Sequence, residues 1–246
     1  MSPGQLPEQF APIEATRLLR FACHPGVACF TECCRELDLA LTPYDVLRLK
    51  RHLEISSGKF LAQYVIVEWD EQQVFPNCYL TMVDDGRASC VFVDAAGCTV
   101  YTDRPGSCRA YPIGRGAART VEGRPAESLV LIREPHCLGF GEEAEQAAGD
   151  YLRDQGLEPY NQYNDALLEL LQHPRVRNRT FRPTRHQLDQ YMLALYDLDQ
   201  FRSALNEGRL TLADTLTPAQ LKGLTGDDEE LLLLGIRWLM REFFGE

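Results

Sequence analysis

Apolar residues recur at helical spacing through the second half of the chain, but not through most of the first half. From about residue 141 onward this pattern predicts helices over 142–155, 160–172, 184–206, 217–223 and 227–244. In the third of these segments Leu188, Met192 and Leu195 fall on one face. Acidic residues 227–230 open the last one, as the helix dipole favours. We therefore expect a helical domain over residues 141–246.

Two helices are also predicted in the first half of the chain. Residues 1–13 show no helical period and predict an extended N-terminal arm. A helix start follows at Thr42, which is placed to act as the N-cap, with Pro43 at the first helical position and Asp45 completing the cap. A second helix is predicted from residue 57 through residue 64.

Between residues 65 and 133 the period shortens to that of strands. Strands are predicted at 65–67, 79–83, 90–93, 98–101 and 129–133, turns at 84–86 and 95–97, and a Gly- and Arg-rich loop at 114–125. Segments of this length favour short antiparallel pairs. The predicted fold class is α+β: a small cysteine-rich domain at residues 14–140, with short antiparallel strands and helices, followed by the all-helical region.

The most informative chemistry in the sequence is its cysteine pattern. Eight of the nine cysteines form an ordered series: Cys23, Cys29, Cys33, Cys34, Cys90, Cys98, Cys108 and Cys137. Clustered thiolates favour zinc, copper(I) or iron–sulfur over magnesium or calcium. The spacings C-x5-C-x3-C-C and C-x7-C-x9-C match neither a zinc ribbon nor the ferredoxin run. Cys78 lies outside the series and is predicted to be a buried strand residue.

A disulfide framework is the competing interpretation of these cysteines. The chain opens without a basic, apolar secretory signal, and no apolar run is long enough to span a membrane. We therefore expect a cytoplasmic protein, where disulfides rarely persist. The number of cysteines is odd, and the adjacent Cys33 and Cys34 cannot pair without strain. Metal binding is the better interpretation.

Charge narrows the range of partners. A net charge of −11 and a pI near 5.0 argue against binding to nucleic acid or to an acidic membrane surface. The arginines between residues 175 and 185 are a local exception that could hold an anion or a phosphate, although a solvated loop is the simpler interpretation. Ionised thiolates would add negative charge that a cation relieves, so metal binding and folding are expected to be coupled. No G-x-S-x-G, H-E-x-x-H or P-loop motif indicates an enzyme class.

Several motifs match one known family in order along the chain. They are Phe21-Ala22-Cys23 with Cys29 and Cys33-Cys34-Arg35, Leu41-Thr42-Pro43-Tyr44-Asp45, Cys90-Val91-Phe92, Gly97-Cys98-Thr99-Val100-Tyr101, Arg104-Pro105-x-x-Cys108-Arg109-x-Tyr111-Pro112, and Cys137-x-Gly139. Together they resemble the bacterial YkgJ-type CxxCxxCC cysteine-cluster family of zinc- or iron-chelating domains. The resemblance covers roughly residues 21–140. The opening cysteine spacing is wider than the family name implies.

The resemblance implies a metal or iron–sulfur centre held by the eight cysteines. A related arrangement occurs in flagellin lysine methylases, so modification of another protein is a candidate role. So many thiolates favour an iron–sulfur (4Fe-4S) cluster with a redox or cofactor-dependent role. The alternative is a non-catalytic zinc module that binds a protein partner through its helical half.

Other residues near the cysteines are candidates for supporting roles. Arg35, Arg104 and Arg109 could donate N–H groups to sulfur, and ion pairing with nearby aspartates is an equally good interpretation. His24 and His136 each neighbour a proposed ligand and could replace a thiolate. The eight thiolates could serve one centre or two.

Overall fold

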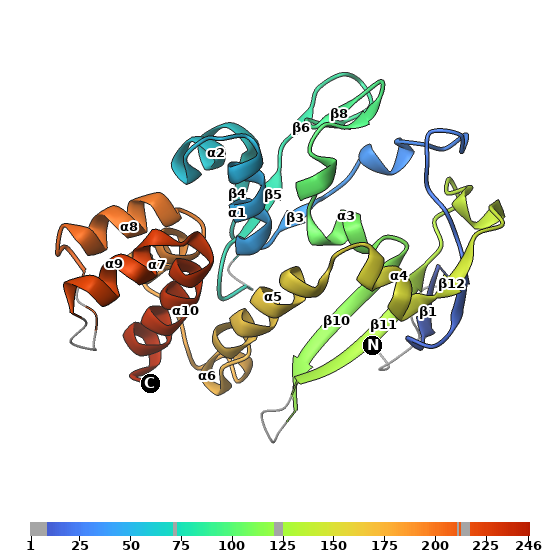
Figure 1. The fold of residues 1–246 in the computed structure, drawn as a ribbon. Helices are drawn as coiled ribbons and strands as arrows, with labels where there is room; N and C mark the ends of the chain where they lie inside the picture. Colours follow the sequence, from blue (N-terminus) through green and yellow to red (C-terminus); the bar gives the residue numbers. More distant parts are fainter. Residues whose placement is uncertain (1–8, 71–72, 121–124, 211, 213–216) are drawn as a thin grey trace. The chain divides into compact units, whose positions relative to one another are not determined.

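A computed structural model describes residues 9–70, 73–120, 125–210, 212 and 217–246 (Figure 1). The chain divides into two compact units. Unit 1 contains residues up to 38 and 82–161, and unit 2 contains 39–81 and 162–246. Each unit is therefore discontinuous in sequence. Segment 39–81, which carries the first two long helices, groups with the C-terminal helices and not with the patterned cysteines.

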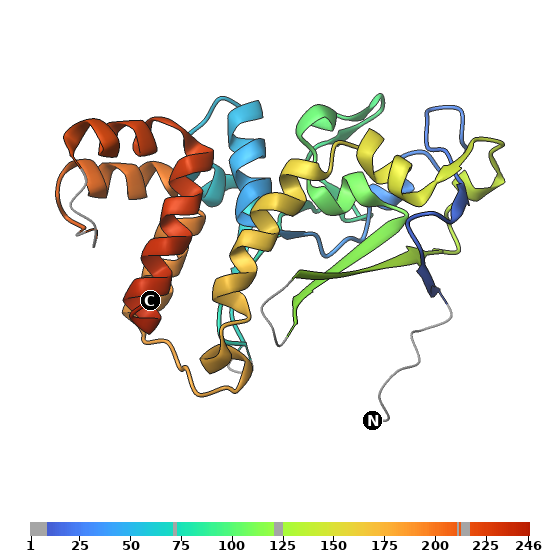
Figure 2. The same ribbon diagram turned by 60° about the horizontal axis from the view of Figure 1, so that its bottom comes forward.

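Unit 1 is built on two small antiparallel sheets. One has the strand order β1 (Phe10–Ile13), β11 (Pro125–Ile132), β10 (Ile113–Arg119), and the other pairs β2 (Leu18–Arg20) with β12 (Glu145–Ala147). Figure 2 shows β10 and β11 as the long green ribbon pair of this unit. A core of Leu19, Phe21, Ile113, Leu129 and Tyr151 joins the two sheets to α4 (Ala148–Asp154). Of the predicted N-terminal arm, residues 10–13 form β1, and residues 1–8 lie outside the described part of the chain.

The predicted loop at 114–125 was wrong for residues 114–119, which belong to strand β10, and residues 121–124 lie outside the described part of the chain. The glycines of this strand lie at close range to side chains across the sheet. A Cβ on Gly114 would lie 2.9 Å from Cγ2 of Val130, and one on Gly116 would lie 2.8 Å from Oγ of Ser128. The glycines thus permit a close strand pair and do not mark a loop.

Five of the patterned cysteines lie on short elements of unit 1: the 3₁₀ turn Glu32–Cys34, β7 (Ser89–Cys90), β9 (Gly97–Cys98) and α3 (Gly106–Ala110). Cys23, Cys29 and Cys137 lie between elements. The same unit contains β6 (Met82–Val83), β8 (Val93–Asp94) and the 3₁₀ turns Tyr101–Asp103 and Gly139–Gly141. The predicted hairpin at 95–97 is confirmed, with β8 pairing with β9. The Asp94 side chain accepts from the backbone amides of Ala96 and Gly97 at 2.7 and 3.0 Å, which closes the turn.

Unit 2 combines helices with one three-stranded sheet. Its elements are β3 (Ala40–Leu41), α1 (Pro43–His52), α2 (Ser57–Tyr64), β4 (Val65–Glu68), β5 (Asn77–Leu80), α5 (Glu158–Leu171, from residue 162 on), α6 (Pro174–Arg177), α7 (Arg185–Leu195), α8 (Leu198–Asn206), α9 (Pro218–Gly226) and α10 (Asp228–Phe244). The capping box predicted for α1 is confirmed, since Thr42 N donates to Asp45 Oδ2 at 2.8 Å and Asp45 N donates to Thr42 Oγ1 at 3.3 Å. Cys78 is a buried strand residue of β5, as predicted.

A buried lysine links four helices of unit 2. Nζ of Lys50, on α1, lies 2.9 Å from Asp228 Oδ2 on α10 and 3.2 Å from both carboxylate oxygens of Asp199 on α8. Asp199 also accepts from the backbone amide of Ser57, on α2, at 2.7 Å. Burial raises the pKa of Asp228, but its bond to Lys50 and the charges of Arg202 and Arg51 outweigh burial, and its pKa is lowered on balance.

The α+β fold class is confirmed, with two corrections in the helical region. Residues 145–147, predicted to be helical, form strand β12 against β2. The single helix predicted over 184–206 is two helices, because Asp197 starts a new one by accepting from Gln200 N at 3.4 Å. No helix in the described residues is long and apolar enough to cross a membrane.

Candidate metal centre

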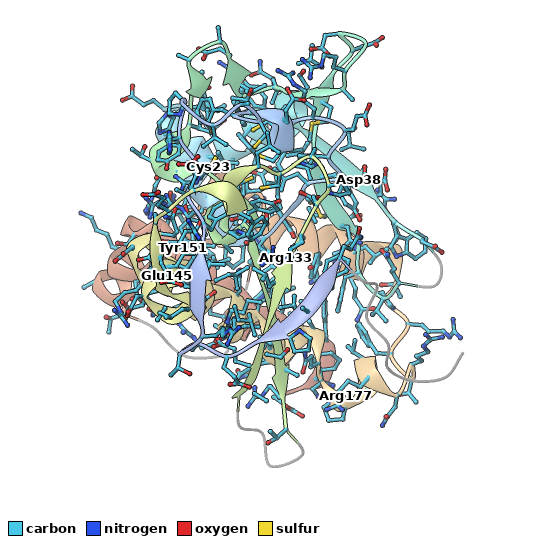
Figure 3. All side chains as sticks on the ribbon, turned by 90° about the vertical axis from the view of Figure 1, so that its right-hand side faces the viewer. Cys23, Asp38, Arg133, Glu145, Tyr151 and Arg177 are labelled. Carbon is cyan, nitrogen blue, oxygen red and sulfur yellow. The ribbon has the colours of Figure 1, made fainter. Side chains whose placement is uncertain are left out.

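All eight patterned cysteines lie in unit 1, whereas Cys78 lies in unit 2. None of the nine, all of which are described, is in a disulfide. Cys23 follows strand β2 and is exposed, and Figure 3 labels it together with Tyr151 of the same unit. The structure thus brings the two halves of the cysteine pattern, which are separated by segment 39–81, into one compact unit.

One part of the cluster surrounds an open hollow. Cys23, Cys29, Cys33 and Cys137 line it together with Phe21, Ala22, Val27, Tyr111, His136 and Gly139. The backbone amide of Leu138 donates to Sγ of Cys29 at 3.1 Å, which fixes the opening cysteine loop beside the last cysteine. Burial raises the pKa of Cys23 to about 11, and the neighbouring thiols of Cys33, Cys29 and Cys137 contribute to the rise.

The other cysteines lie on the β7–β9 segment and α3. An antiparallel bridge between Arg35 and Ser89 places Cys34 opposite Cys90. Burial raises the pKa of Cys90, and the nearby Cys98 adds to that effect. Cys90 and Cys108 also contribute to a raised pKa of Cys34, after the larger effects of its hydrogen bond to Cys33 and of burial.

The adjacent Cys33 and Cys34 behave as a coupled pair. The thiol of Cys34 donates a hydrogen bond to the sulfur of Cys33, which favours the thiolate form of Cys33 and lowers its pKa to about 7. The same bond raises the pKa of Cys34. Cys33 is therefore ready to ionise near neutral pH, as a metal ligand must.

Within the described residues, no group of three or more His, Cys, Asp or Glu side chains is arranged so that it could hold a metal ion. The thiols are gathered in one region without converging on a common point. Which of the eight bind a metal therefore stays a prediction.

Two buried polar atoms near the cysteines lack a hydrogen-bond partner in the described part of the chain: Nε of Arg35 and the hydroxyl of Tyr111. Nε of Arg35 lies 3.7 Å from Oε1 of Glu32, so the charge of this arginine is paired although Nε makes no hydrogen bond. The Tyr111 hydroxyl lies near the thiol of Cys137 and the carboxylate of Glu134, and burial together with these two neighbours raises its pKa. A hydroxyl beside a thiol is the kind of donor found around metal-bound thiolates.

The other two candidate arginines are held by backbone carbonyls and by the side chain of Gln155. Arg109 donates to the carbonyl oxygens of Arg104 at 3.1 Å, Gln155 at 2.9 Å and Thr102. Arg104 donates to Tyr101 O at 2.8 Å and Gln155 Oε1 at 2.5 Å, and it stacks on the Tyr101 ring at 3.7 Å. Burial raises the pKa of Cys98, and the charge of Arg104 opposes that rise. Arg104 thus acts on the thiols at least through its charge.

The two candidate histidines differ in their surroundings. His24 is engaged through both ring nitrogens, since Nδ1 accepts from Gly26 N at 3.1 Å and Nε2 lies 3.2 Å from a carboxylate oxygen of Glu142. His136 lines the hollow, with Nε2 3.5 Å from Oε2 of Glu134. Of the two, His136 is the one placed beside the thiols of the hollow.

The sequence did not indicate that Tyr151 and Gln155, which follow the last cysteine in the chain, contact residues next to the cysteines. Gln155 holds both Arg104 and Arg109, and the hydroxyl of Tyr151 donates to Tyr111 O at 2.6 Å. Both follow strand β12, in a segment predicted to be one helix of a separate domain. The aromatic residues near the cysteines were the available signal: Phe21 packs against Tyr111, Phe140 and Tyr151 with ring centroids 5.2–6.1 Å apart.

Comparison with known families agrees with the thiol arrangement. Residues 22–137 match the family named CxxCxxCC and described as "Putative zinc- or iron-chelating domain". The matched residues contain every patterned cysteine, and the match confirms the resemblance drawn from the motifs. No curated protein and no solved structure matches the chain. The family supports chelation of zinc or iron, without deciding between them.

Proposed function

We propose that unit 1 binds an iron–sulfur centre, with a 4Fe-4S cluster favoured, and that this centre serves a redox or cofactor-dependent reaction. Modification of another protein is the candidate reaction. One observation carries the proposal: eight thiols, none of them in a disulfide, share one compact unit, with the buried Tyr111 hydroxyl beside the thiol of Cys137.

The number of thiols gathered in unit 1 favours iron–sulfur over zinc. A donor beside sulfur suits either centre, because zinc-bound thiolates and the sulfurs of a cluster both accept hydrogen bonds. In a cluster these bonds also influence the reduction potential. Cys23 and Cys33 are exposed, which supports electron transfer to or from the surface.

The chain's own residues would tune such a centre, which supplies one-electron transfer when bound. The Tyr111 hydroxyl is placed to donate to the Cys137 sulfur, and Arg104 adds positive charge near Cys23 and Cys98. Phe21 gives the hollow an apolar wall and packs on Phe140, with ring centroids 5.2 Å apart. Arg35, Arg104 and Arg109 remain the candidate cofactor-binding residues, Arg35 through its Nε.

Anaerobic purification followed by a visible spectrum tests this proposal. We expect broad absorption in the blue region that bleaches with dithionite and returns on reoxidation, together with iron. A colourless protein that carries stoichiometric zinc and shows no redox change would contradict it. Lys59 is exposed and lies in unit 2, away from the patterned cysteines in sequence and in unit, so Lys59→Met is expected to leave the spectrum and the iron content unchanged.

A zinc-bound module that docks a protein partner is the second candidate function. It is favoured by an arginine-rich stretch in unit 2: the 19 residues between Glu169 and Asp189 include five arginines and no acidic residue. All five arginines, from Arg175 to Arg185, are exposed. In an acidic chain this stretch is suited to an acidic protein surface. This candidate predicts that chelator unfolds unit 1 and that zinc restores it.

A further inference from the structure

We propose that the eight cysteines form two four-thiolate sites, divided between the adjacent residues Cys33 and Cys34. The first site comprises Cys23, Cys29, Cys33 and Cys137, and the second comprises Cys34, Cys90, Cys98 and Cys108. This inference rests on the proposed metal-binding function and adds to it the number of sites and the grouping of their ligands.

The first group is defined by the hollow that its members share. Cys23, Cys29, Cys33 and Cys137 line it, and none of the other patterned cysteines does. Backbone hydrogen bonds close the loops around it: Leu138 N donates to Cys29 Sγ at 3.1 Å, and Ala22 N donates to Gly139 O at 3.1 Å. These bonds hold the residues next to Cys23 and Cys137 together across the hollow.

The second group is defined by strand pairing. The bridge between Arg35 and Ser89 is antiparallel, so the residue before Arg35 lies opposite the residue after Ser89. Those two residues are Cys34 and Cys90. The amide of Glu36 donates to Ala88 O at 3.0 Å and extends this pairing.

The remaining two members follow directly along the same segment. Cys98 lies on β9 opposite Val93, and Thr99 N donates to Phe92 O at 2.8 Å, so the hairpin folds back toward Cys90. Cys108 lies on α3, which begins at Gly106 after the short turn that follows this hairpin.

Proximity of the thiols supports the same division. Cys29, Cys33 and Cys137 are close enough to Cys23 to interact with it through charge. Cys33, Cys90 and Cys108 are close enough to Cys34 to do the same. Cys33 is near both sets, and its position on the hollow assigns it to the first.

Four thiolates per site satisfy the coordination of either candidate centre. Zinc in structural sites takes four ligands in a tetrahedron, and a 4Fe-4S cluster takes four cysteines. Because the Cys34 thiol contacts the Cys33 sulfur, the two sites are neighbours. Cys33 then binds the metal of the first site and Cys34 binds the metal of the second, so the adjacent cysteines do not both belong to one site.

Reconstitution of the full chain with ¹¹³Cd alone tests the division, because cadmium replaces zinc at thiolate sites and its NMR shift reports the number of sulfur ligands. We expect two cadmium ions per chain by native mass spectrometry and two resonances in the range for four thiolates. One ion per chain, or a single resonance, would overturn the division while leaving the metal-binding function intact. Absence of bound cadmium would overturn that function as well.

Variants then assign the ligands. Cys137→Ser is expected to remove or shift one resonance and leave the other, and Cys98→Ser is expected to do the reverse. Cys78→Ser, in unit 2, is expected to leave both in place. Loss of both resonances in either ligand variant, with a native circular dichroism spectrum, would indicate one joint centre. If a variant fails to fold, the ion count and resonance count of the unsubstituted chain still decide between one site and two.

Discussion

Sγ of Cys29 accepts a hydrogen bond from the backbone amide of Leu138 at 3.1 Å, although 109 residues separate the two. This bond joins the opening cysteine loop to the residue that follows the last patterned cysteine. The hollow lined by Cys23, Cys29, Cys33 and Cys137 thus depends on the backbone course of the segment around Leu138.

Gly139 is required by the close approach of two backbone segments. A Cβ at this position would lie 2.6 Å from the carbonyl oxygen of Ala22 and 2.6 Å from the ring of Phe21. Backbone contacts of this kind cannot relax cheaply, so Gly139→Ala is expected to lower the free energy of unfolding by about 1–3 kcal/mol. Urea unfolding followed by circular dichroism measures this loss.

Gly141 offers the matched control, two residues away in the same 3₁₀ turn. A Cβ there meets nothing within 4 Å, and Gly141→Ala is expected to change stability by less than about 0.5 kcal/mol. Equal effects of the two substitutions would show that the close approach at Gly139 does not matter.

In unit 2, Lys50 is expected to carry more stability than any exposed lysine of that unit. It is 6% exposed and lies between Asp199 and Asp228, so Lys50→Met leaves the buried Asp228 and the half-buried Asp199 without their shared cation. We expect the free energy of unfolding to fall by about 3 kcal/mol, the lower end of the range for breaking a buried ion pair. The fall stays at this lower end because Arg51 and Arg202 still neutralise Asp228. Substitution of the exposed Lys59, as Lys59→Met, is the control. If both variants lowered the free energy of unfolding by a similar small amount, the buried ion pairs of Lys50 would not be what stabilises unit 2.

The same cluster predicts how stability depends on pH. Burial raises the pKa of Asp199 and Asp228, but their hydrogen bonds and the charge of Lys50 outweigh it, so both pKa values are lowered. A lowered carboxyl pKa stabilises the fold above the unfolded value of about 3.9, and this stability is lost as the pH falls through the folded value.

The stability difference between the unsubstituted chain and Lys50→Met should therefore be full at pH 6 and shrink below about pH 4. Unfolding in urea at a series of pH values measures this difference. A difference that does not change with pH would show that Lys50 acts through packing and not through charge.

The Tyr111 hydroxyl is predicted to tune the centre without stabilising the fold. It is buried without a nitrogen or oxygen partner and faces Cys137. Tyr111→Phe should therefore leave thermal stability after chelator treatment nearly unchanged. With the centre bound, loss of a donor to sulfur disfavours the more negative reduced state, so the midpoint potential should become more negative. An unchanged potential in a redox titration would mean that the hydroxyl does not reach the sulfur of the bound centre.

The sequence was informative where a local signal decides the structure. The Thr42–Asp45 capping box and the turn at 95–97 depend on neighbouring residues alone, and both are confirmed. The cysteine series predicted one cysteine-rich region, and all eight thiols share unit 1. Cys78 was correctly separated from them because it lies outside the motifs and within an apolar strand.

Pairing between distant segments was not visible in the sequence. Strand β12 has three residues, too few to show a period, and it forms only because Leu18–Arg20 is there to pair with it. Gly114 and Gly116 resembled loop residues because the need for a close strand approach depends on Val130 and Ser128 across the sheet. The role of Gln155 at Arg104 and Arg109 is likewise a long-range contact that carries no motif.

The central claim is that the cysteines of unit 1 hold an iron–sulfur centre. Acid-labile sulfide, measured together with iron and zinc in the anaerobically purified full chain, tests it most directly, because only a cluster contains inorganic sulfide. We predict iron and sulfide in nearly equal amounts, with both reduced in Cys137→Ser and unchanged in Cys78→Ser. Zinc bound without any sulfide would contradict the claim and establish the zinc module instead.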